Sequence, residues 1–113
     1  MTATYVLNRN GAGKYVFTFK THDGQELLTS QAYADKDRAL RAIDAARVLA
    51  RRARNYEICT AEGGQAYYVL KHARWGVIGQ SEMYPDSESV LEGITVARAK
   101  TRGAQLEDLT DNS

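Results

Sequence analysis

Large apolar residues occupy alternate positions in two separate stretches of the chain. In residues 15–20 (YVFTFK) a tyrosine and two phenylalanines alternate with other side chains, and residues 66–71 (AYYVLK) carry a similar pattern. Successive side chains of a strand point to opposite faces, so a period of two indicates a strand with one buried face. Short β-rich stretches at residues 4–8 and 56–60 precede the alternating ones. The pattern predicts two strands in each half of the chain.

A glycine-containing turn follows each alternating stretch. Asp23-Gly24 leads from residues 15–20 into a third β-rich stretch, and Asp-Gly is a favoured pair in two-residue hairpins because such turns need positive φ angles. The corresponding segment of the second half, residues 74–76 (RWG), has its glycine one place later. We therefore expect a hairpin in each half, with a two-residue turn in the first and another type of turn in the second.

A helix is expected after each hairpin. Asp35 and Asp86 can accept hydrogen bonds from the free N–H groups at a helix start, and apolar residues follow them at helical spacing. Those apolar residues are Leu40, Ile43, Leu91 and Ile94. The spacing predicts two helices of roughly four turns, each with its isoleucine facing the core.

The two halves are copies of one unit, because the chain matches itself without gaps at a shift of 51 residues. Identical pairs include Tyr5 with Tyr56, Gly13 with Gly64, Lys20 with Lys71, Ser30 with Ser81, Tyr33 with Tyr84, Ile43 with Ile94 and Arg47 with Arg98. We predict an α+β fold of two tandem β-β-β-α repeats, residues 1–54 and 55–113. The repeats are expected to share one core in a single domain of residues 1–113, because about fifty residues bury too little surface to fold alone.

Four features taken together point to a known family. They are the strand that ends at Lys20, the Asp23-Gly24 turn, and residues 27–33 (LLTSQAY) and 78–84 (IGQSEMY). In these features the chain resembles the YegP-like family of small bacterial and archaeal proteins, a domain of unknown function. The resemblance implies one antiparallel sheet with both helices packed on one face, each helix exchanged onto the strands of the other repeat. It implies no activity.

Length, charge and cysteine content narrow the class of protein. At 113 residues with a formal net charge of +1, the chain fits one ordinary domain and has no overall field that favours a polyanionic partner. No apolar run approaches the length of a membrane span, and residues 1–10 lack the layout of a secretory signal. Cys59 is the only cysteine, which excludes an internal disulfide and agrees with a reducing compartment. We expect a soluble cytoplasmic protein that does not engage a membrane.

No catalytic, cofactor or metal site is expected. Residues 11–14 (GAGK) look like the end of a phosphate-binding loop, but its first glycine and its metal-binding hydroxyl are missing, and a strand rather than a helix follows. Ser30 and Ser81 lack a Gly-x-Ser-x-Gly turn, and His22 and His72 show no ligand spacing. We expect the serines to be structural and the histidines to lie at the surface. The prediction is a protein that is not an enzyme.

Positive charge concentrates on the first helix and its end. Residues 36–54 contain seven lysines and arginines against two aspartates. Such a surface can bind phosphates by releasing counterions, but charge runs on helices are commonly solubilising, and the acidic tail can neutralise part of this one. The candidate binding residues on this surface are Arg38, Arg41, Arg51 and Arg52. Arg47 and Arg98 lie one turn beyond the core isoleucines, and we expect them to bridge to carbonyls or carboxylates.

The sheet face opposite the helices is the second candidate surface. If the aromatic residues of 15–20 point inward, Lys20 points outward, as do Tyr67, Val69 and Lys71 of the second repeat. Such a face can bind a protein, stack single-stranded bases or simply face water. Our leading hypothesis is a small non-enzymatic interaction module, monomer or homodimer, that engages an unknown protein partner through its sheet face or edge. The alternative is a weak nucleic-acid binder that uses the first helix with Lys20 and Lys71.

The C-terminal tail is expected to be partly ordered. The 51-residue shift places it where the first strand of a third copy would begin, and Leu106 and Leu109 are its large apolar residues. A disordered tail is typically polar throughout. We predict that residues 105–109 lie extended against the body, with Leu106 or Leu109 packed near the end of a helix. Residues 111–113 are expected to be the frayed end.

Overall fold

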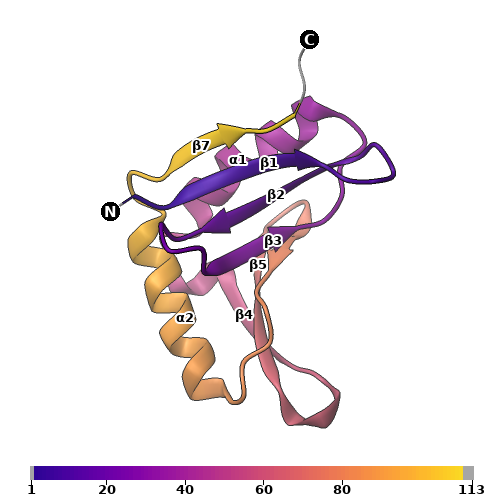
Figure 1. The fold of residues 1–113 in the computed structure, drawn as a ribbon. Coiled ribbons are helices and arrows are strands. Elements are labelled where there is room, and N and C mark those ends of the chain that lie inside the picture. The colour runs from indigo at the N-terminus through magenta and orange to yellow at the C-terminus, as the bar shows by residue number, and fades with distance from the viewer. Residues whose placement is uncertain (1, 111–113) are drawn as a thin grey trace.

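The order β-β-β-α occurs twice before a final strand in the computed structural model, which describes residues 2–110 (Figure 1). The first repeat contains β1 (Thr4–Arg9), β2 (Tyr15–Lys20), β3 (Glu26–Ser30) and α1 (Lys36–Leu49). The second contains β4 (Tyr56–Thr60), β5 (Ala66–His72), β6 (Gly76–Gln80) and α2 (Ser87–Lys100). Two short 3-10 helices, η1 (Ala53–Asn55) and η2 (Glu62–Gly64), flank β4, and β7 (Gln105–Asp108) follows α2. The predicted α+β fold of two tandem repeats is confirmed.

All seven strands belong to one sheet, in the order β4-β5-β6-β3-β2-β1-β7. The two repeats meet at β3 and β6, which pair antiparallel with Thr29 opposite Gln80. These two residues are equivalent under the 51-residue shift. An approximate two-fold axis therefore passes between them and relates one half of the sheet to the other.

The sheet is mixed, which corrects the expectation of a wholly antiparallel one. β7 pairs in parallel with β1, with Thr4 opposite Gln105 and Leu7 opposite Asp108. Parallel neighbours need a long connection, and the chain between β1 and β7 includes both helices, so the parallel direction is accessible to β7. The other strand pairs are antiparallel.

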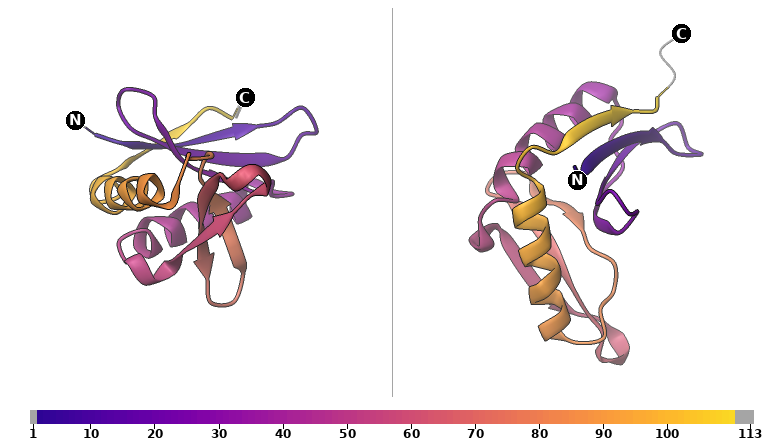
Figure 2. Two further views of the ribbon diagram at one scale, coloured as in Figure 1. Left: turned by 90° about the horizontal axis from the view of Figure 1, so that it is seen from below. Right: turned by 60° about the vertical axis from the view of Figure 1, so that its left-hand side comes forward.

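Both helices lie on the same face of the twisted sheet (Figures 1 and 2). The main contacts of α2 are with β4 and β5 of its own repeat, whereas α1 contacts β2 of its own repeat and β5 of the other. The exchange of helices implied by the family resemblance is therefore wrong for α2 and holds only in part for α1. In Figure 1, β1 to β3 run across the view while β4 and β5 run down it. This twist of the sheet allows α1 to contact both β2 and β5, which lie on either side of the junction of the repeats.

The predicted helix starts are confirmed. Asp35 Oδ1 accepts a hydrogen bond from the backbone N–H of Arg38 at 2.8 Å, and Asp86 Oδ1 accepts one from Ser89 at 2.8 Å. Each aspartate has extended backbone angles and satisfies one of the free N–H groups of its helix. The two copies of the repeat thus begin their helices in the same way.

The first hairpin has a longer turn than predicted. Thr21 N–H donates to Gln25 O at 2.9 Å and Gly24 N–H donates to Thr21 O at 3.1 Å, so three residues rather than two lie inside the turn. The pairing of β2 with β3 shifts register between Phe19 and Lys20, and this irregularity adds the extra residue. The second hairpin has the equivalent register shift, between Leu70 and Lys71, and differs, as expected, in its turn, because its positive φ lies at Gly76 (74°) and not at the position equivalent to Gly24.

One hydrophobic core lies between the sheet and the helices. Its largest fully buried side chains are Tyr5, Tyr68, Phe17, Phe19, Leu7, Leu27, Ile43, Leu70, Ile78 and Val90. Members come from both repeats, and the Tyr68 hydroxyl donates a hydrogen bond to the backbone carbonyl of Leu27 across the junction. The repeats therefore contribute to one shared interior.

Candidate functional site

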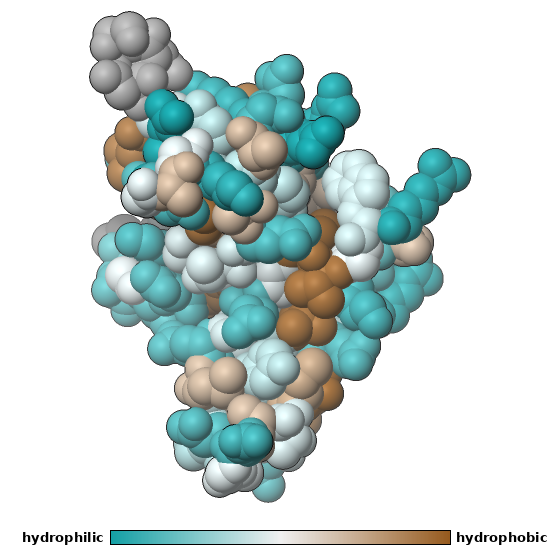
Figure 3. Space-filling model, turned by 90° about the vertical axis from the view of Figure 1, so that its right-hand side faces the viewer, coloured by the Kyte–Doolittle hydropathy of each residue, from teal (hydrophilic) through white to brown (hydrophobic). Residues whose placement is uncertain are grey.

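The outward face of the sheet carries one continuous row of paired residues across all seven strands. From β7 to β4 the row is Glu107, Val6, Thr18, Thr29, Gln80, Val69 and Glu57. Most of these side chains are polar or charged. Apolar side chains on the side of the molecule drawn in Figure 3 form small groups within a mainly polar surface.

The predicted residues of the sheet face do not form one cluster. Lys20 on β2 and Lys71 on β5 are separated by β3 and β6. Lys71 Nζ lies 2.9 Å from Glu57 Oε1, so its charge is paired, and the pKa of Lys71 is raised by that hydrogen bond. Tyr67 lies opposite Cys59 on the neighbouring strand, and Val69 is buried at 7% exposure.

The predicted arginines of the first helix form two separate groups. Arg38 and Arg41 lie in the first two turns of α1, whereas Arg51 and Arg52 follow its C-terminal end. A helix of 14 residues separates its ends by about 20 Å. The helices also occupy the face of the sheet opposite the row of outward residues, so no single surface joins these arginines to Lys20 and Lys71.

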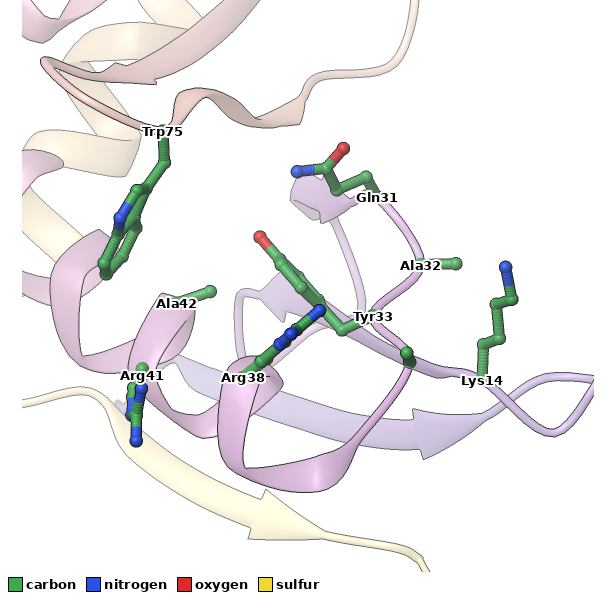
Figure 4. A pocket seen from close by; sticks show the side chains of 9 residues that line it. Lys14, Gln31, Ala32, Tyr33, Arg38, Arg41, Ala42 and Trp75 are labelled. Atoms are coloured by element: carbon green, nitrogen blue, oxygen red, sulfur yellow. The ribbon is translucent and has the colours of Figure 1, made fainter.

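Arg38 and Arg41 line a cavity of about 520 Å³ between the start of α1 and the hairpin of β5 and β6 (Figure 4). The cavity is lined by Lys14, Gln31, Ala32, Tyr33, Ala34, Arg38, Arg41, Ala42 and Trp75. In Figure 4 the Tyr33 hydroxyl points toward Trp75 and Arg38 lies beside the Tyr33 ring. The Arg41 side chain points away from the two rings, and Lys14 stands beyond Ala32. Three cations and two aromatic rings therefore surround one hollow without a lining carboxylate.

Local contacts fix the two aromatic rings. His72 Nδ1 accepts hydrogen bonds from the backbone N–H groups of Arg74 and Trp75, at 3.0 and 3.1 Å, and its ring stacks on Trp75 with centroids 4.1 Å apart. Tyr33 exchanges two backbone hydrogen bonds with Tyr15, both 2.8 Å. Burial raises the pKa of Tyr33, and a hydrogen bond with the Gln31 side chain lowers it by a smaller amount. The net pKa is raised, so the Tyr33 hydroxyl stays protonated at neutral pH.

The second notable feature is the free edge of β4. β1 and β4 are equivalent strands, but the outer edge of β1 is covered by β7, whereas β4 ends the sheet within residues 2–110. Leu7 of β1 has 0% exposure, and its equivalent Ile58 of β4 is 41% exposed. The Leu7 carbonyl accepts a hydrogen bond from Leu109 N–H at 2.9 Å. By the repeat symmetry, the backbone groups of Ile58 point outward from the sheet.

Polar contacts hold β7 on β1. Arg47 Nη1 donates to the carbonyl of Ala104 at 2.6 Å, and Lys36 Nζ lies 2.6 Å from Asp108 Oδ2. Extended order of the tail is thus confirmed, but the predicted packing of its leucines is wrong, because Leu106 and Leu109 are 43% and 55% exposed. Residues 111–113, the predicted frayed end, lie outside the described residues. The bridging role expected of Arg47 is confirmed.

The residues considered for catalysis have structural roles. Ser30 Oγ accepts from Phe17 N–H and donates to Gln31 O, and Ser81 Oγ makes the equivalent bonds with Tyr68 N–H and Glu82 O. Residues 11–14 form a turn around the Asn10 side chain and lead into β2. Within residues 2–110 no three His, Cys, Asp or Glu side chains group as metal ligands. In the same part of the chain no helix is long and apolar enough to cross a bilayer.

Comparison with known proteins finds the same repeat. The domain of unknown function DUF1508 matches residues 10–57 and 61–108, two copies that are 51 residues apart. A UPF0339 protein of Photorhabdus laumondii is 33% identical over 94% of this chain and 93% of its own length. UPF0339 protein YegP of Escherichia coli is 30% identical over 97% of this chain and 100% of its own length.

Solved structures share the fold. The solution NMR structure of YegP, a protein of unknown function from Escherichia coli, superimposes with a TM-score of 0.91 at 29% identity and covers 100% of this chain and 97% of its own. A UPF0339 protein from Shewanella oneidensis gives a TM-score of 0.89 at 26% identity, over 97% and 93% of the two chains. Two DUF1508 repeats, relatives at full length and a shared fold lead to one conclusion: the chain belongs to the YegP-like, or UPF0339, family.

Proposed function

We propose that the protein is a small, non-enzymatic, cytoplasmic binding module that receives an extended segment of a partner protein along the free edge of β4. The observation that supports this most directly is a difference between two equivalent strands: β7 covers the outer edge of β1, whereas among residues 2–110 no strand covers the outer edge of β4. An edge strand presents a row of unpaired N–H and C=O groups. Addition of a partner strand to such an edge is a recurrent mode of peptide recognition.

β7 on β1 gives the template for this addition. The added segment would run parallel to β4, with one residue opposite Tyr56 and another opposite Ile58, as β7 places Leu106 opposite Tyr5 and Asp108 opposite Leu7. An apolar side chain near Ile58 would cover the surface that remains exposed there. Main-chain hydrogen bonds would give affinity, and the contacts at Tyr56 and Ile58 would give specificity.

The charges around β4 favour an acidic partner. Arg51 and Arg52 are exposed just before β4, and Arg98 Nε donates to the Arg51 carbonyl at 3.1 Å, which adds a third guanidinium at this end. In a parallel arrangement the N-terminal end of the partner segment lies beside the start of β4. We therefore expect aspartate or glutamate at that end of the segment.

Substitution of Ile58 by proline tests the proposal. The backbone N–H of Ile58 points away from β5, so Ile58→Pro removes no hydrogen bond of the sheet but blocks strand addition. A library of random peptides displayed on phage would be panned against the wild-type protein, with Ile58→Ala as the matched control that keeps the N–H. We expect peptides with acidic N-terminal ends that bind wild type, bind Ile58→Ala more weakly because the side-chain contact is smaller, and do not bind Ile58→Pro.

Two outcomes of the panning experiment would contradict the proposal. Failure to enrich any peptide, or enrichment of peptides that bind Ile58→Pro equally well, would contradict the use of this edge.

The nucleic-acid alternative has weaker support, because its arginines and lysines lie on separate surfaces. Titration of wild type with a single-stranded oligonucleotide at two salt concentrations checks it, since phosphate-driven binding must weaken steeply with salt.

A further inference from the structure

The charged and indole side chains that line the cavity beside α1 do not follow the repeat symmetry. Residues 51 apart are equivalent, yet the lining cations and the indole of the cavity have different counterparts in the other half. Lys14 corresponds to Gln65, Arg38 to Ser89, Arg41 to Glu92, Ala42 to Gly93 and Trp75 to Gly24. The equivalent position in the other half therefore lacks these three cations and the indole.

The packing of the tyrosine that both repeats carry, Tyr33 and Tyr84, also differs between the halves. In the second repeat Tyr84 lies so close to Gly93 that an added Cβ would collide with the Tyr84 hydroxyl. Ala42 carries a Cβ at the equivalent position of the first repeat, so Tyr33 cannot pack on its helix in the same way. Tyr33 instead lines the cavity.

We propose that this cavity binds a small anion that carries a flat aromatic ring, such as a nucleoside monophosphate or an aromatic carboxylate. Its volume of about 520 Å³ lies within the range of small-molecule sites, roughly 300 to 1,000 Å³. The site is separate from the free edge of β4 and does not depend on the function proposed for that edge.

The aromatic part of the ligand is placed by Trp75 and Tyr33. Trp75 lines the cavity and remains 54% exposed, with one ring contact already made to His72. The His72 side chain fixes the turn and the indole together, so little conformational freedom is lost when a ring stacks on Trp75. Tyr33 points its hydroxyl toward Trp75 and can donate a hydrogen bond to the ligand (Figure 4).

The anionic part is placed by the cations. Arg38 lies beside Tyr33, and its Nε is 3.5 Å from Asp35 Oδ2 in an exposed pair that leaves the rest of the guanidinium for a ligand. A guanidinium matches phosphate and carboxylate geometry through two parallel hydrogen bonds. Lys14 and Arg41 are long, exposed side chains at the rim that can turn toward a bound anion. A neutral ring or a bare phosphate would use only half of these contacts.

Trp75 is the only tryptophan, so its fluorescence reports on the cavity directly. The wild-type protein would be titrated with adenosine monophosphate and with benzoate, which distinguish the phosphate and carboxylate versions of the ligand. Adenosine and inorganic phosphate supply the ring and the anion separately. We expect a saturable change in Trp75 fluorescence with at least one of the two combined ligands and binding about tenfold or more weaker with either separate part.

Two substitutions copy the other repeat into the cavity. Arg38→Ser and Arg41→Glu install the residues found at the equivalent positions of α2, and the double variant should weaken binding of the combined ligand by about a hundredfold through loss of charge-assisted hydrogen bonds and added repulsion. Arg52→Ser removes the same charge beyond the other end of α1 and should leave binding unchanged. Ile58→Pro should also bind normally, which separates this site from the edge of β4. A thermal melt of each variant confirms that it is folded.

Several results would overturn the proposal. One is the lack of a saturable response to both combined ligands, and another is unchanged binding by the folded double variant. Equal binding of inorganic phosphate or of adenosine alone would show that the ring or the anion is not recognised. Affinity that rises steadily with the length of a single-stranded oligonucleotide would point to nucleic acid in place of a small ligand.

Discussion

Ile43 and Ile94 occupy equivalent positions on α1 and α2, with 1% and 7% exposure. Deletion of a buried isoleucine side chain removes its transfer free energy and leaves a cavity. We predict that Ile43→Ala and Ile94→Ala each lower the free energy of unfolding by about 2 to 5 kcal/mol. Denaturant melts followed by circular dichroism measure this change.

Val48→Ala is the control on the same helix as Ile43. Its side chain is 59% exposed, and its truncation should cost under about 1 kcal/mol. A loss below about 1 kcal/mol for the isoleucine variants as well would mean that the buried faces of the helices contribute less than their exposure indicates.

The sequence predicts the role of a single residue correctly where its side chain acts on its near neighbours in the chain. The capping aspartates, the buried isoleucines and the structural serines all follow from short-range patterns. Leu106 and Leu109 misled the prediction, because an apolar residue in a tail suggests burial. The tail is held instead by backbone pairing and by Lys36, which hydropathy does not report.

The strand β7 depends on a charge pair at its end. Hydrogen bonds from Lys36 and, to a lesser extent, from Thr110 together lower the pKa of Asp108 from its ordinary 3.8 to about 2. A carboxyl group whose pKa is depressed in the folded state stabilises that state above its unfolded pKa and stops doing so as pH falls through its folded pKa. We predict that β7 loosens from β1 as the pH falls from about 4 to about 2. Hydrogen exchange at Leu109 N–H, which donates to Leu7, follows the change.

Lys36→Gln is the matched variant for this prediction. It keeps a polar side chain but removes the charge, so the pKa of Asp108 observed by NMR should rise toward its ordinary 3.8, while the hydrogen bonds from Thr110 still hold it below that value. The pH at which hydrogen exchange at Leu109 N–H speeds up should rise together with this pKa. An Asp108 titration that is the same in both proteins would show that Lys36 does not hold the strand.

Elements formed by local patterns were predictable, and their partners were less so. The strands, both helices and the duplication follow from periodicity and from the 51-residue shift. The direction of β7 and the packing of α2 on its own repeat depend on the sheet twist and on long-range pairing, which short patterns do not contain. The first hairpin turn was mispredicted because the register shift beside Lys20 cannot be read from Asp23-Gly24.

Across the whole molecule, the two repeats are held together by contacts that cross from one to the other. The repeats meet at the pairing of β3 with β6, α1 contacts β5, and Tyr68 donates to Leu27 of the other half. We predict that residues 1–54 expressed alone do not fold as a monomer, since their core is small and loses its neighbour. Thermal melts with size-exclusion chromatography test this.

A dimer of the fragment would agree with the prediction, because β3 of a second copy can take the place of β6. A monomer with a cooperative thermal transition would refute it.

The same long-range pairing explains why only part of the candidate cavity was predictable. Arg38 and Arg41 were visible as charges and Tyr33 lies close to them in the sequence, whereas Trp75 joins them only because β6 lies beside β3.

The central pairing of Thr29 with Gln80 has a consequence for how this fold can change. A single repeat that dimerised through this strand would form the same sheet. Every substitution would then appear twice, once on each side of the symmetry axis. With both halves on one chain, each position can vary independently of its counterpart. An indole can therefore stand at Trp75 while Gly24 keeps the opposite turn small, and a symmetric scaffold can hold an asymmetric surface.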